Sequence, residues 1–143
     1  MIADKKLISA SSSETVDTGV AFGKLLKPGD VVCLYGNLGA GKTQFTKGIA
    51  QAMGINPEEV QSPTFAIIHE YASDVPLYHL DCYRLESAEE AMNIGIEEYL
   101  FGQGVCVIEW PEVIESLLPD HVRSVTIEHE EKEKRRITIH QKA

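Results

Sequence analysis

The chain has 143 residues, 43% of them hydrophobic and 24% charged, which is typical of a globular protein that buries a core. Its formal net charge of −9 argues against direct binding of nucleic-acid phosphates, so any role in nucleic-acid biology is expected to run through a partner. The polar start argues against a signal peptide, no apolar run approaches the ~20 residues of a membrane span, and we expect a single cytoplasmic domain over residues 1–143.

The first predicted elements are a strand at residues 6–10 and a helix that follows it. Ser11 and Glu14 have the spacing of a capping box, which satisfies free N–H groups at the start of a helix. Because helix N-termini also attract anions, Ser12 and Thr15 are candidate nucleotide-binding residues. A serine-rich helix start is more often a simple cap.

The rest of this helix is predicted to face the core. Phe22, Leu25 and Leu26 recur at i, i+3 and i+4, which is the spacing of an apolar helical stripe. The Lys-Pro-Gly-Asp sequence at residues 27–30 then predicts a turn.

Residues 36–43, with the sequence GNLGAGKT, match the phosphate-binding loop (P-loop or Walker A) pattern G-x-x-x-x-G-K-[ST]. The apolar run at residues 31–35 predicts a buried strand before the loop, and helical spacing begins at Lys42, so the context of the motif is also right. Lys42 is expected to reach the β- and γ-phosphates, and the Thr43 hydroxyl is expected to bind Mg²⁺. The candidate nucleotide-binding residues here are Asn37, Leu38, Gly39, Ala40, Gly41, Lys42 and Thr43.

The helix after the loop is predicted to pack on the sheet. Phe45, Ile49 and Met53 recur at helical spacing, and Gly54 is a candidate C-cap. Thr64 lies in the following loop and is a candidate sensor of the γ-phosphate, although a plain turn threonine is equally consistent. Residues 66–71 and 75–81 then predict an antiparallel hairpin.

Two acids at predicted strand ends are the candidate catalytic carboxylates. Short helices are predicted at residues 86–92 and 94–100, and a fully apolar strand at residues 105–108 then runs into Glu109, as in the second magnesium-site strand of P-loop proteins. We expect Glu109 to hold Mg²⁺ together with Thr43, and Asp81 to orient the attacking water or share the metal. With Lys42, these two acids make up the predicted catalytic set.

Trp110, the only tryptophan, follows Glu109 and is a candidate cover for the site or a core residue. Strands at residues 122–127 and 137–140, joined by a charged turn, close the chain. Arg84 is a candidate stabiliser of phosphate charge or a candidate anchor for Asp81, and Arg135 and Arg136 are ambiguous between the hairpin surface and the edge of a nucleotide. Cys33 and Cys106 are expected to be small core residues, because both lie inside apolar runs that predict strands. The spacing of the three cysteines indicates neither a disulfide framework nor a zinc site.

Two sequence motifs that are absent from the chain narrow the class of enzyme. The sequence has no N-K-x-D guanine signature, which favours ATP, and no arginine-rich lid of the kind that nucleoside monophosphate kinases use. These features favour an Mg²⁺-dependent ATPase. A small-molecule P-loop kinase and a nucleotide-gated regulatory switch remain alternatives.

Four motifs in order resemble those of the bacterial TsaE (YjeE) ATPases. They are GNLGAGKT at residues 36–43, SPTF at residues 62–65, HLDCYR at residues 79–84 and EWPE at residues 109–112, and the match runs from about Ser11 to Pro119. Cys82 stands where the pattern leads us to expect a larger apolar residue. The strands after Pro119 match least well.

The resemblance implies an α/β, three-layer P-loop fold with a mixed, mostly parallel central sheet flanked by helices. It also implies an ATPase that is weak alone and acts with the TsaB and TsaD proteins to form N6-threonylcarbamoyladenosine (t6A) at position 37 of ANN-decoding tRNAs. The tRNA would be bound by the partners, as the acidic charge of the chain also suggests. By the same analogy Thr43 and Glu109 hold Mg²⁺, Asp81 is needed for hydrolysis, Thr64 lies in a switch-like segment, and Trp110 lies beside the site.

Overall fold

The order of secondary-structure elements follows the hydrophobic pattern of the sequence closely. The computed structural model describes residues 4–37, 39–60 and 68–140. The elements are β1 (Lys5–Ser9), α1 (Ser12–Gly23), β2 (Val31–Tyr35), α2 (Lys42–Ala52), η1 (Pro57–Glu59), β3 (Ile68–Tyr71), β4 (Leu77–Asp81), α3 (Ala88–Asn93), α4 (Ile96–Leu100), β5 (Val105–Glu109), η2 (Pro111–Leu117), β6 (Val122–His129) and β7 (Arg135–His140), where η marks a 3-10 helix.

The strands form one seven-stranded sheet in the order β1-β7-β6-β2-β5-β4-β3. The pairs β2–β6, β2–β5 and β4–β5 are parallel, whereas β1, β7 and β3 run antiparallel to their neighbours. This confirms the predicted α/β class with a mixed, mostly parallel sheet. It also confirms the predicted antiparallel hairpin, although the first two residues of its predicted first strand lie outside the described residues.

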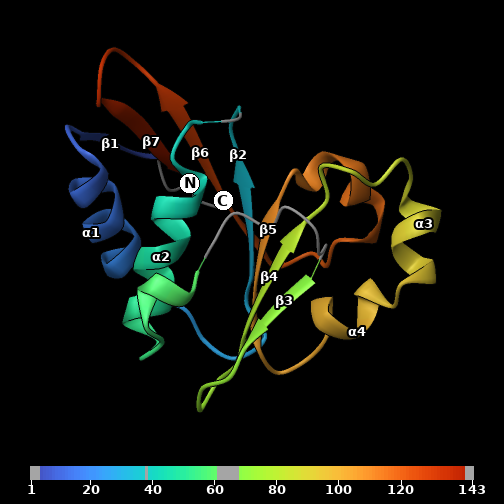
Figure 1. The fold of residues 1–143 in the computed structure, drawn as a ribbon. Helices are drawn as coiled ribbons and strands as arrows, with labels where there is room; N and C mark the ends of the chain where they lie inside the picture. The colour runs from blue at the N-terminus through green and yellow to red at the C-terminus, as the bar shows by residue number, and fades with distance from the viewer. Residues whose placement is uncertain (1–3, 38, 61–67, 141–143) are drawn as a thin grey trace.

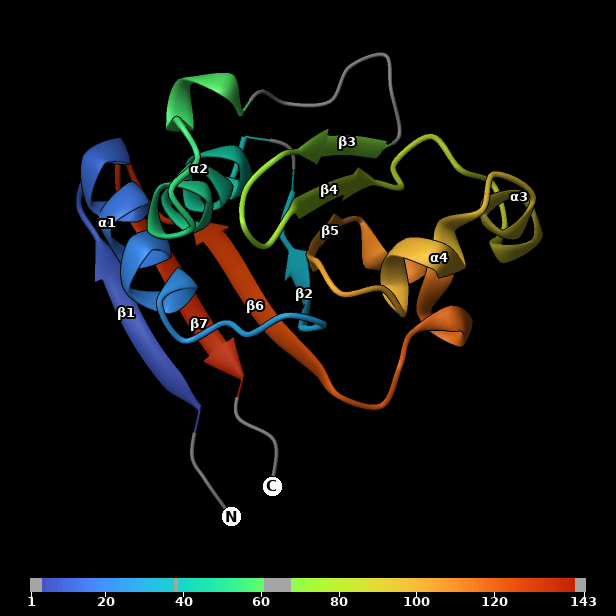
Figure 2. The same ribbon diagram turned by 90° about the horizontal axis from the view of Figure 1, so that it is seen from below.

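Helices cover both faces of the sheet, as Figures 1 and 2 show: α1 and α2 pack side by side on one face, and α3 and α4 lie on the other. The central strand β2 alternates between the two cores, with Val32 and Leu34 facing α1 and α2, and Val31 and Cys33 facing the opposite side. All four are fully buried, because a strand covered on both faces needs a continuous apolar sequence.

The helix α1 is shorter than the helix that the apolar spacing predicts. It ends at Gly23, so Phe22 is buried against Phe45, with the two ring centroids 5.5 Å apart, but Leu25 lies past the helix end and is 62% exposed. The prediction that Leu25 faces the core was therefore wrong. At the other predicted boundaries, Ser11 caps α1 by accepting a hydrogen bond from the Glu14 N–H, and Gly54 follows the last residues of α2 with a φ of +80°.

All three cysteines are free and buried, which confirms the prediction for Cys33 and Cys106 and extends it to Cys82. The 3-10 helix η2, directly after Trp110, was not predicted; its start at Pro111 is consistent with the preference of proline for the first position of a helix. Within the described ranges, no helix is long and apolar enough to cross a membrane.

Candidate functional site

The phosphate-binding loop joins the end of β2 to the start of α2. Gly39 and Gly41 have φ angles of +81° and +107°, a region that residues with a Cβ avoid. Among the described residues no side chain caps α2, and its first backbone hydrogen bond runs from the Phe45 N–H to the Gly41 carbonyl. The earlier N–H groups of the helix are therefore left for an anion, and the helix dipole adds to the attraction.

A pocket of about 290 Å³ opens over the loop and the first turn of α2. Its lining residues are Ser12, Gly39, Gly41, Lys42, Thr43, Gln44, Glu109 and Arg135. The structure thus brings together Ser12, from the start of α1, with the predicted metal pair Thr43 and Glu109. The alternation of β5 points Glu109 to the same face as Val107, toward α2.

Not every predicted residue meets in this pocket. The Thr15 hydroxyl is buried, lies 2.7 Å from the Ser9 hydroxyl, and donates to the Ser11 carbonyl at 3.2 Å, so it is hydrogen-bonded within the turn that joins β1 to α1. Asn37 is exposed, and its carbonyl accepts from the Ala40 N–H at 3.1 Å, which closes the turn of the loop. Leu38 and Thr64 lie outside the described residues.

Glu109 is held by a buried histidine. Only 4% of Glu109 is exposed, and its Oε2 lies 2.5 Å from Nε2 of His79, which is fully buried on the neighbouring strand β4. A carboxylate taken out of water needs such a partner. The second carboxylate oxygen has no side-chain partner among the described residues and is left for a ligand.

Asp81 pairs in register with Glu109 at the carboxyl ends of β4 and β5. Its Oδ1 accepts from the Tyr83 N–H at 2.9 Å. Burial raises the pKa of Asp81, and the neighbouring Glu109 charge acts in the same direction, whereas the Tyr83 hydrogen bond, His79 and Lys42 oppose them. Two carboxylates side by side at strand ends make an arrangement suited to proton transfer or to binding a cation.

Lys42 is buried between the loop and Trp110. Its ammonium donates to the Gly36 carbonyl at 2.7 Å and lies 4.0 Å from the centre of the Trp110 ring. Burial lowers the pKa of Lys42, and the charges of Glu109, Asp81 and Glu112 oppose the shift. The indole therefore shields the lysine from solvent through a cation–π contact.

The position of Trp110 depends on an unusual backbone. Its φ and ψ of 57° and 52° place it in the left-handed region, which residues other than glycine rarely adopt, and the residue after it is Pro111. This turn at the end of β5 brings the indole back over Lys42, where it also packs on Tyr83 with ring centroids 5.0 Å apart. Strained backbone of this kind is common at functional sites.

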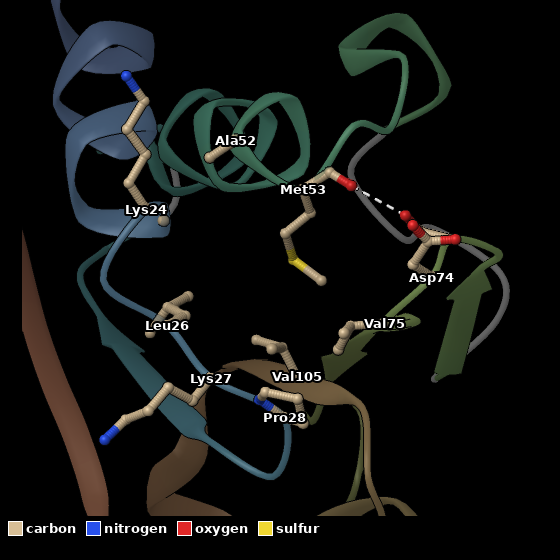
Figure 3. A pocket seen from close by; sticks show the side chains of 11 residues that line it. Lys24, Leu26, Lys27, Pro28, Ala52, Met53, Asp74, Val75 and Val105 are labelled. Atoms are coloured by element: carbon tan, nitrogen blue, oxygen red, sulfur yellow. Dashed lines mark hydrogen bonds between the residues drawn. The ribbon is translucent and has the colours of Figure 1, made fainter.

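Two other pockets differ in chemistry. One of about 400 Å³ lies on the opposite flank of the loop and is lined by Trp110, Glu112 and Asn37, among others. Figure 3 shows another, of about 330 Å³, between the end of α2 and the turn before β4, where the apolar side chains of Met53 and Val75 converge and the Lys27 amine points away. The pocket in Figure 3 is lined neither by Asp81 or Glu109 nor by the first turn of α2. The pocket over the phosphate-binding loop, which combines Glu109 with that turn, is therefore the stronger candidate.

Sequence reasoning missed one residue at the site, His79, and left another, Arg135, undecided. His79 had a detectable signal, because it alternates with Asp81 on one face of an otherwise apolar strand. Arg135 lines the pocket and its Nη2 donates to the Gly39 carbonyl at 3.3 Å, whereas Arg136 pairs with Glu130 at 2.6 Å on the hairpin. Nothing in the local sequence distinguishes these two arginines.

The donor set fits a magnesium ion that is shared with a substrate. Thr43 and Glu109 line one pocket, and within residues 4–37, 39–60 and 68–140 no group of three or more His, Cys, Asp or Glu side chains could hold a metal by itself. Mg²⁺ usually takes only one or two protein ligands and completes its shell with substrate phosphates and water. A hydroxyl and a carboxylate beside a phosphate-binding loop meet that requirement.

Comparison with known proteins points to one family. Residues 9–137 match the family described as "Threonylcarbamoyl adenosine biosynthesis protein TsaE". Proteins named "tRNA threonylcarbamoyladenosine biosynthesis protein TsaE" are 44% identical in Treponema pallidum, over 85% of this chain and 90% of that protein, and 50% identical in Bacillus subtilis, over 79% and 70%. The crystal structure of Bacillus subtilis YdiB superposes with a TM-score of 0.79 at 38% identity, covering 97% of this chain and 86% of that one.

Proposed function

The chain belongs to the TsaE family, and from that premise we propose that it is an Mg²⁺-dependent ATPase that supports t6A formation on tRNA. The observation that carries the proposal is the shared pocket of Lys42, Thr43 and Glu109 at an uncapped helix N-terminus. Such a pocket has the donors and charges to bind a polyphosphate with its metal.

Each side chain has a distinct role in the proposed reaction. The N–H groups at the start of α2 and the Lys42 ammonium bind the phosphates, and Thr43 and Glu109 hold Mg²⁺. When bound, Mg²⁺ neutralises charge on the phosphate oxygens. Asp81, beside Glu109 and with its pKa raised by burial, orients the attacking water and accepts its proton.

Trp110 and Thr64 are assigned supporting roles. Trp110 covers Lys42 and excludes water from that side of the loop, which strengthens the electrostatic contacts of the lysine. We assign Thr64, by family analogy, to a segment that responds to the γ-phosphate. Ser12 lines the pocket from α1 and contacts the nucleotide through its hydroxyl.

The ATPase is proposed to act with TsaB and TsaD. The names of the relatives place them in t6A biosynthesis, and a net charge of −9 leaves this chain poorly suited to bind tRNA directly. We therefore propose that the partner proteins bind the tRNA, and that ATP binding and hydrolysis by this chain drive their cycle.

Two substitutions separate binding from chemistry. Lys42→Ala removes a buried cation from the phosphate site, so the Kd for ATP should rise about tenfold or more. Asp81→Ala leaves the loop intact, so ATP affinity should stay within about twofold while phosphate release falls about 100-fold or more. Isothermal titration and a phosphate-release assay measure the two effects.

The role in t6A formation requires a reconstituted reaction. ATP-dependent formation of t6A on tRNA should need this chain together with TsaB and TsaD, and Asp81→Ala should stop repeated rounds. If t6A forms equally well without the chain, the proposed role is wrong. Transfer of the γ-phosphate to a small-molecule acceptor would instead identify a kinase.

A further inference from the structure

A further pocket, of about 470 Å³, lies between α1 and the strands β1, β7 and β6. It is at the opposite end of α1 from the nucleotide pocket. Ser12, the first residue of the helix, lines the nucleotide pocket, whereas Ala21, Phe22 and Leu25, at the end of the helix and just beyond it, line this one. Figure 2 shows α1 lying across β1 and β7. The volume is within the range of roughly 300–1,000 Å³ that is usual for pockets that bind small molecules.

The floor and the helical wall of this pocket are apolar. The apolar lining residues are Leu7 from β1, Ile139 from β7, and Ala21, Phe22 and Leu25 from α1 and the turn after it. Leu7 and Ile139 are only partly buried, and Leu25 is 62% exposed, so the pocket leaves apolar surface in contact with water. Removal of such surface from water is favourable, which favours a ligand with an apolar body.

Two cations flank the floor of the pocket. Lys5 is paired with Ile139 across β1 and β7, and Arg123 lies two residues before Val125, the partner of Ile139 on β6. Because side chains alternate along a strand, Arg123 shares a face with Val125, which belongs to the core under α1 and α2. Within the described residues Lys5 forms no ion pair, and Arg123 forms one, in which its Nε lies 3.6 Å from Asp30 and both Nη groups are left without a partner.

The acid among the described lining residues, Asp17, lies on the helical wall away from these cations. Asp17 is one turn of α1 nearer to the nucleotide pocket than Ala21, whereas Lys5 begins β1 at the remote end. The contact between the Ser9 and Thr15 hydroxyls fixes that direction, because it joins the last residue of β1 to the start of α1. A negative group in the pocket is therefore attracted toward the two cations and repelled from the opposite end.

We propose that this pocket binds a small amphipathic anion, with an apolar body against Leu7, Phe22 and Ile139 and one carboxylate or sulfonate beside Lys5 and Arg123. A polyphosphate fits poorly, because a highly charged ligand would leave the apolar floor uncovered. A hollow between a helix and a sheet also suits a small molecule better than the broad surface that a stable protein interface needs. The site is separate from the phosphate-binding loop, and the inference does not depend on the proposed ATPase activity.

Fluorescence titration of the full chain with anilinonaphthalene sulfonate tests the proposal, because this probe carries one sulfonate on an apolar body. The wild type should bind one probe per chain with saturation. Naphthaleneacetate, a carboxylate of similar shape, should displace the probe, whereas excess ADP should not. Phenylnaphthylamine has the same apolar body without the sulfonate, and it should bind about threefold more weakly or worse, since it lacks the attraction of the two cations.

Substitutions separate the apolar and the charged parts of the site. Ala21→Phe fills the pocket from an exposed position of α1 and should abolish saturable binding of both probes. Lys5→Gln should raise the Kd of the sulfonate about threefold and leave the Kd of phenylnaphthylamine within about 1.5-fold. Lys6→Gln is the matched control, because Lys6 points to the other face of β1, and it should leave both values within about 1.5-fold of the wild type.

Several results would overturn the inference: no saturable binding by the wild type, displacement of the probe by ADP, no displacement by naphthaleneacetate, or equal affinity for the charged and the uncharged probe. Unchanged binding in Ala21→Phe would place the probe elsewhere on the protein. An equal loss in Lys5→Gln and Lys6→Gln would show a general effect of charge and no site. Sedimentation gives a further check, because a wild-type dimer that the probe dissociates would mean that a second copy of the chain covers the pocket.

Discussion

The site is unusual at the residue scale for the number of polar groups that it buries. His79, Glu109 and Lys42 are each at most 4% exposed, yet each has a partner: His79 and Glu109 bond to each other, and Lys42 bonds to the Gly36 carbonyl. Buried groups of this kind are costly unless paired. Their pairing holds the Glu109 carboxylate in one orientation, which would suit the metal-binding role proposed for it.

Substitution of His79 tests this pairing. His79→Leu fills similar space but leaves the buried Glu109 carboxylate without its partner, so the free energy of unfolding should fall by about 2 kcal/mol or more. His79→Gln retains an N–H donor and should lose less. Urea unfolding measures both values. Equal stability of His79→Leu and the wild type would show that the pair contributes nothing to the fold.

The sequence supplied part of the site at this scale. Asp81 and Glu109 were found because each ends an apolar strand, and the phosphate-binding loop because its glycines and lysine have fixed spacing. Arg135 was left undecided between the hairpin surface and the edge of a nucleotide, because its approach to the loop depends on β7 pairing with β6 and β1. That pairing is tertiary, and no local pattern distinguishes Arg135 from Arg136.

At the scale of elements, the loop is held by the packing of α1 on α2. The two helices approach so closely that Gly19 and Gly48 face each other without side chains between them. This contact brings the start of α1, with Ser12, next to the start of α2, with Thr43. Small residues at the crossing therefore bear on the candidate site, because they allow the starts of the two helices to line one pocket.

Gly48→Ala tests the crossing. Alanine favours a helix over glycine by about 1 kcal/mol, so propensity alone predicts a more stable protein. A Cβ at position 48 would, however, lie 2.7 Å from the Gly19 Cα, and the helices would have to separate. We expect the free energy of unfolding to fall by about 1–3 kcal/mol, measured by urea titration. Gln51→Ala, on the exposed side of α2, is the control and should change stability by less than about 0.5 kcal/mol. A stabilised Gly48→Ala would refute the argument.

Element types were easier to predict than their ends. The apolar run of β2 was bounded correctly, because a strand buried on both faces has a continuous apolar sequence. The predicted apolar stripe of α1 extended too far, because Leu25 fits helical spacing but lies after Gly23, the last residue of the helix. The sequence also gave no sign that Trp110 adopts a left-handed backbone, which depends on its contacts with Lys42 and Tyr83.

At the scale of the whole molecule, one sheet serves two purposes. Its parallel centre places the carboxyl ends of β2, β4 and β5 at one edge, where the phosphate-binding loop and both acids meet. The strand β6, parallel to β2, ends at the same edge, and β7 begins there with Arg135 before it runs back antiparallel to β6 and pairs with β1. The face that carries α3 and α4 contributes core packing, including all three cysteines.

The stability of the whole molecule should decrease at alkaline pH, and the three buried cysteine thiols should contribute to that decrease. Burial raises the pKa of Cys33, Cys82 and Cys106 to about 12, against an ordinary value of 9.0. Because the folded-state pKa is the higher one, each thiol stabilises the fold fully below pH 9.0 and loses that contribution as the pH rises toward about 12. Urea unfolding between about pH 8 and about pH 11, followed by Trp110 fluorescence, should show stability falling with pH, and the fall should be shallower in Cys82→Ala by up to about 1.4 kcal/mol per pH unit. Identical dependence of stability on pH in the two proteins would contradict the prediction. It would mean that the Cys82 thiol has the same pKa in the folded and the unfolded chain despite its complete burial.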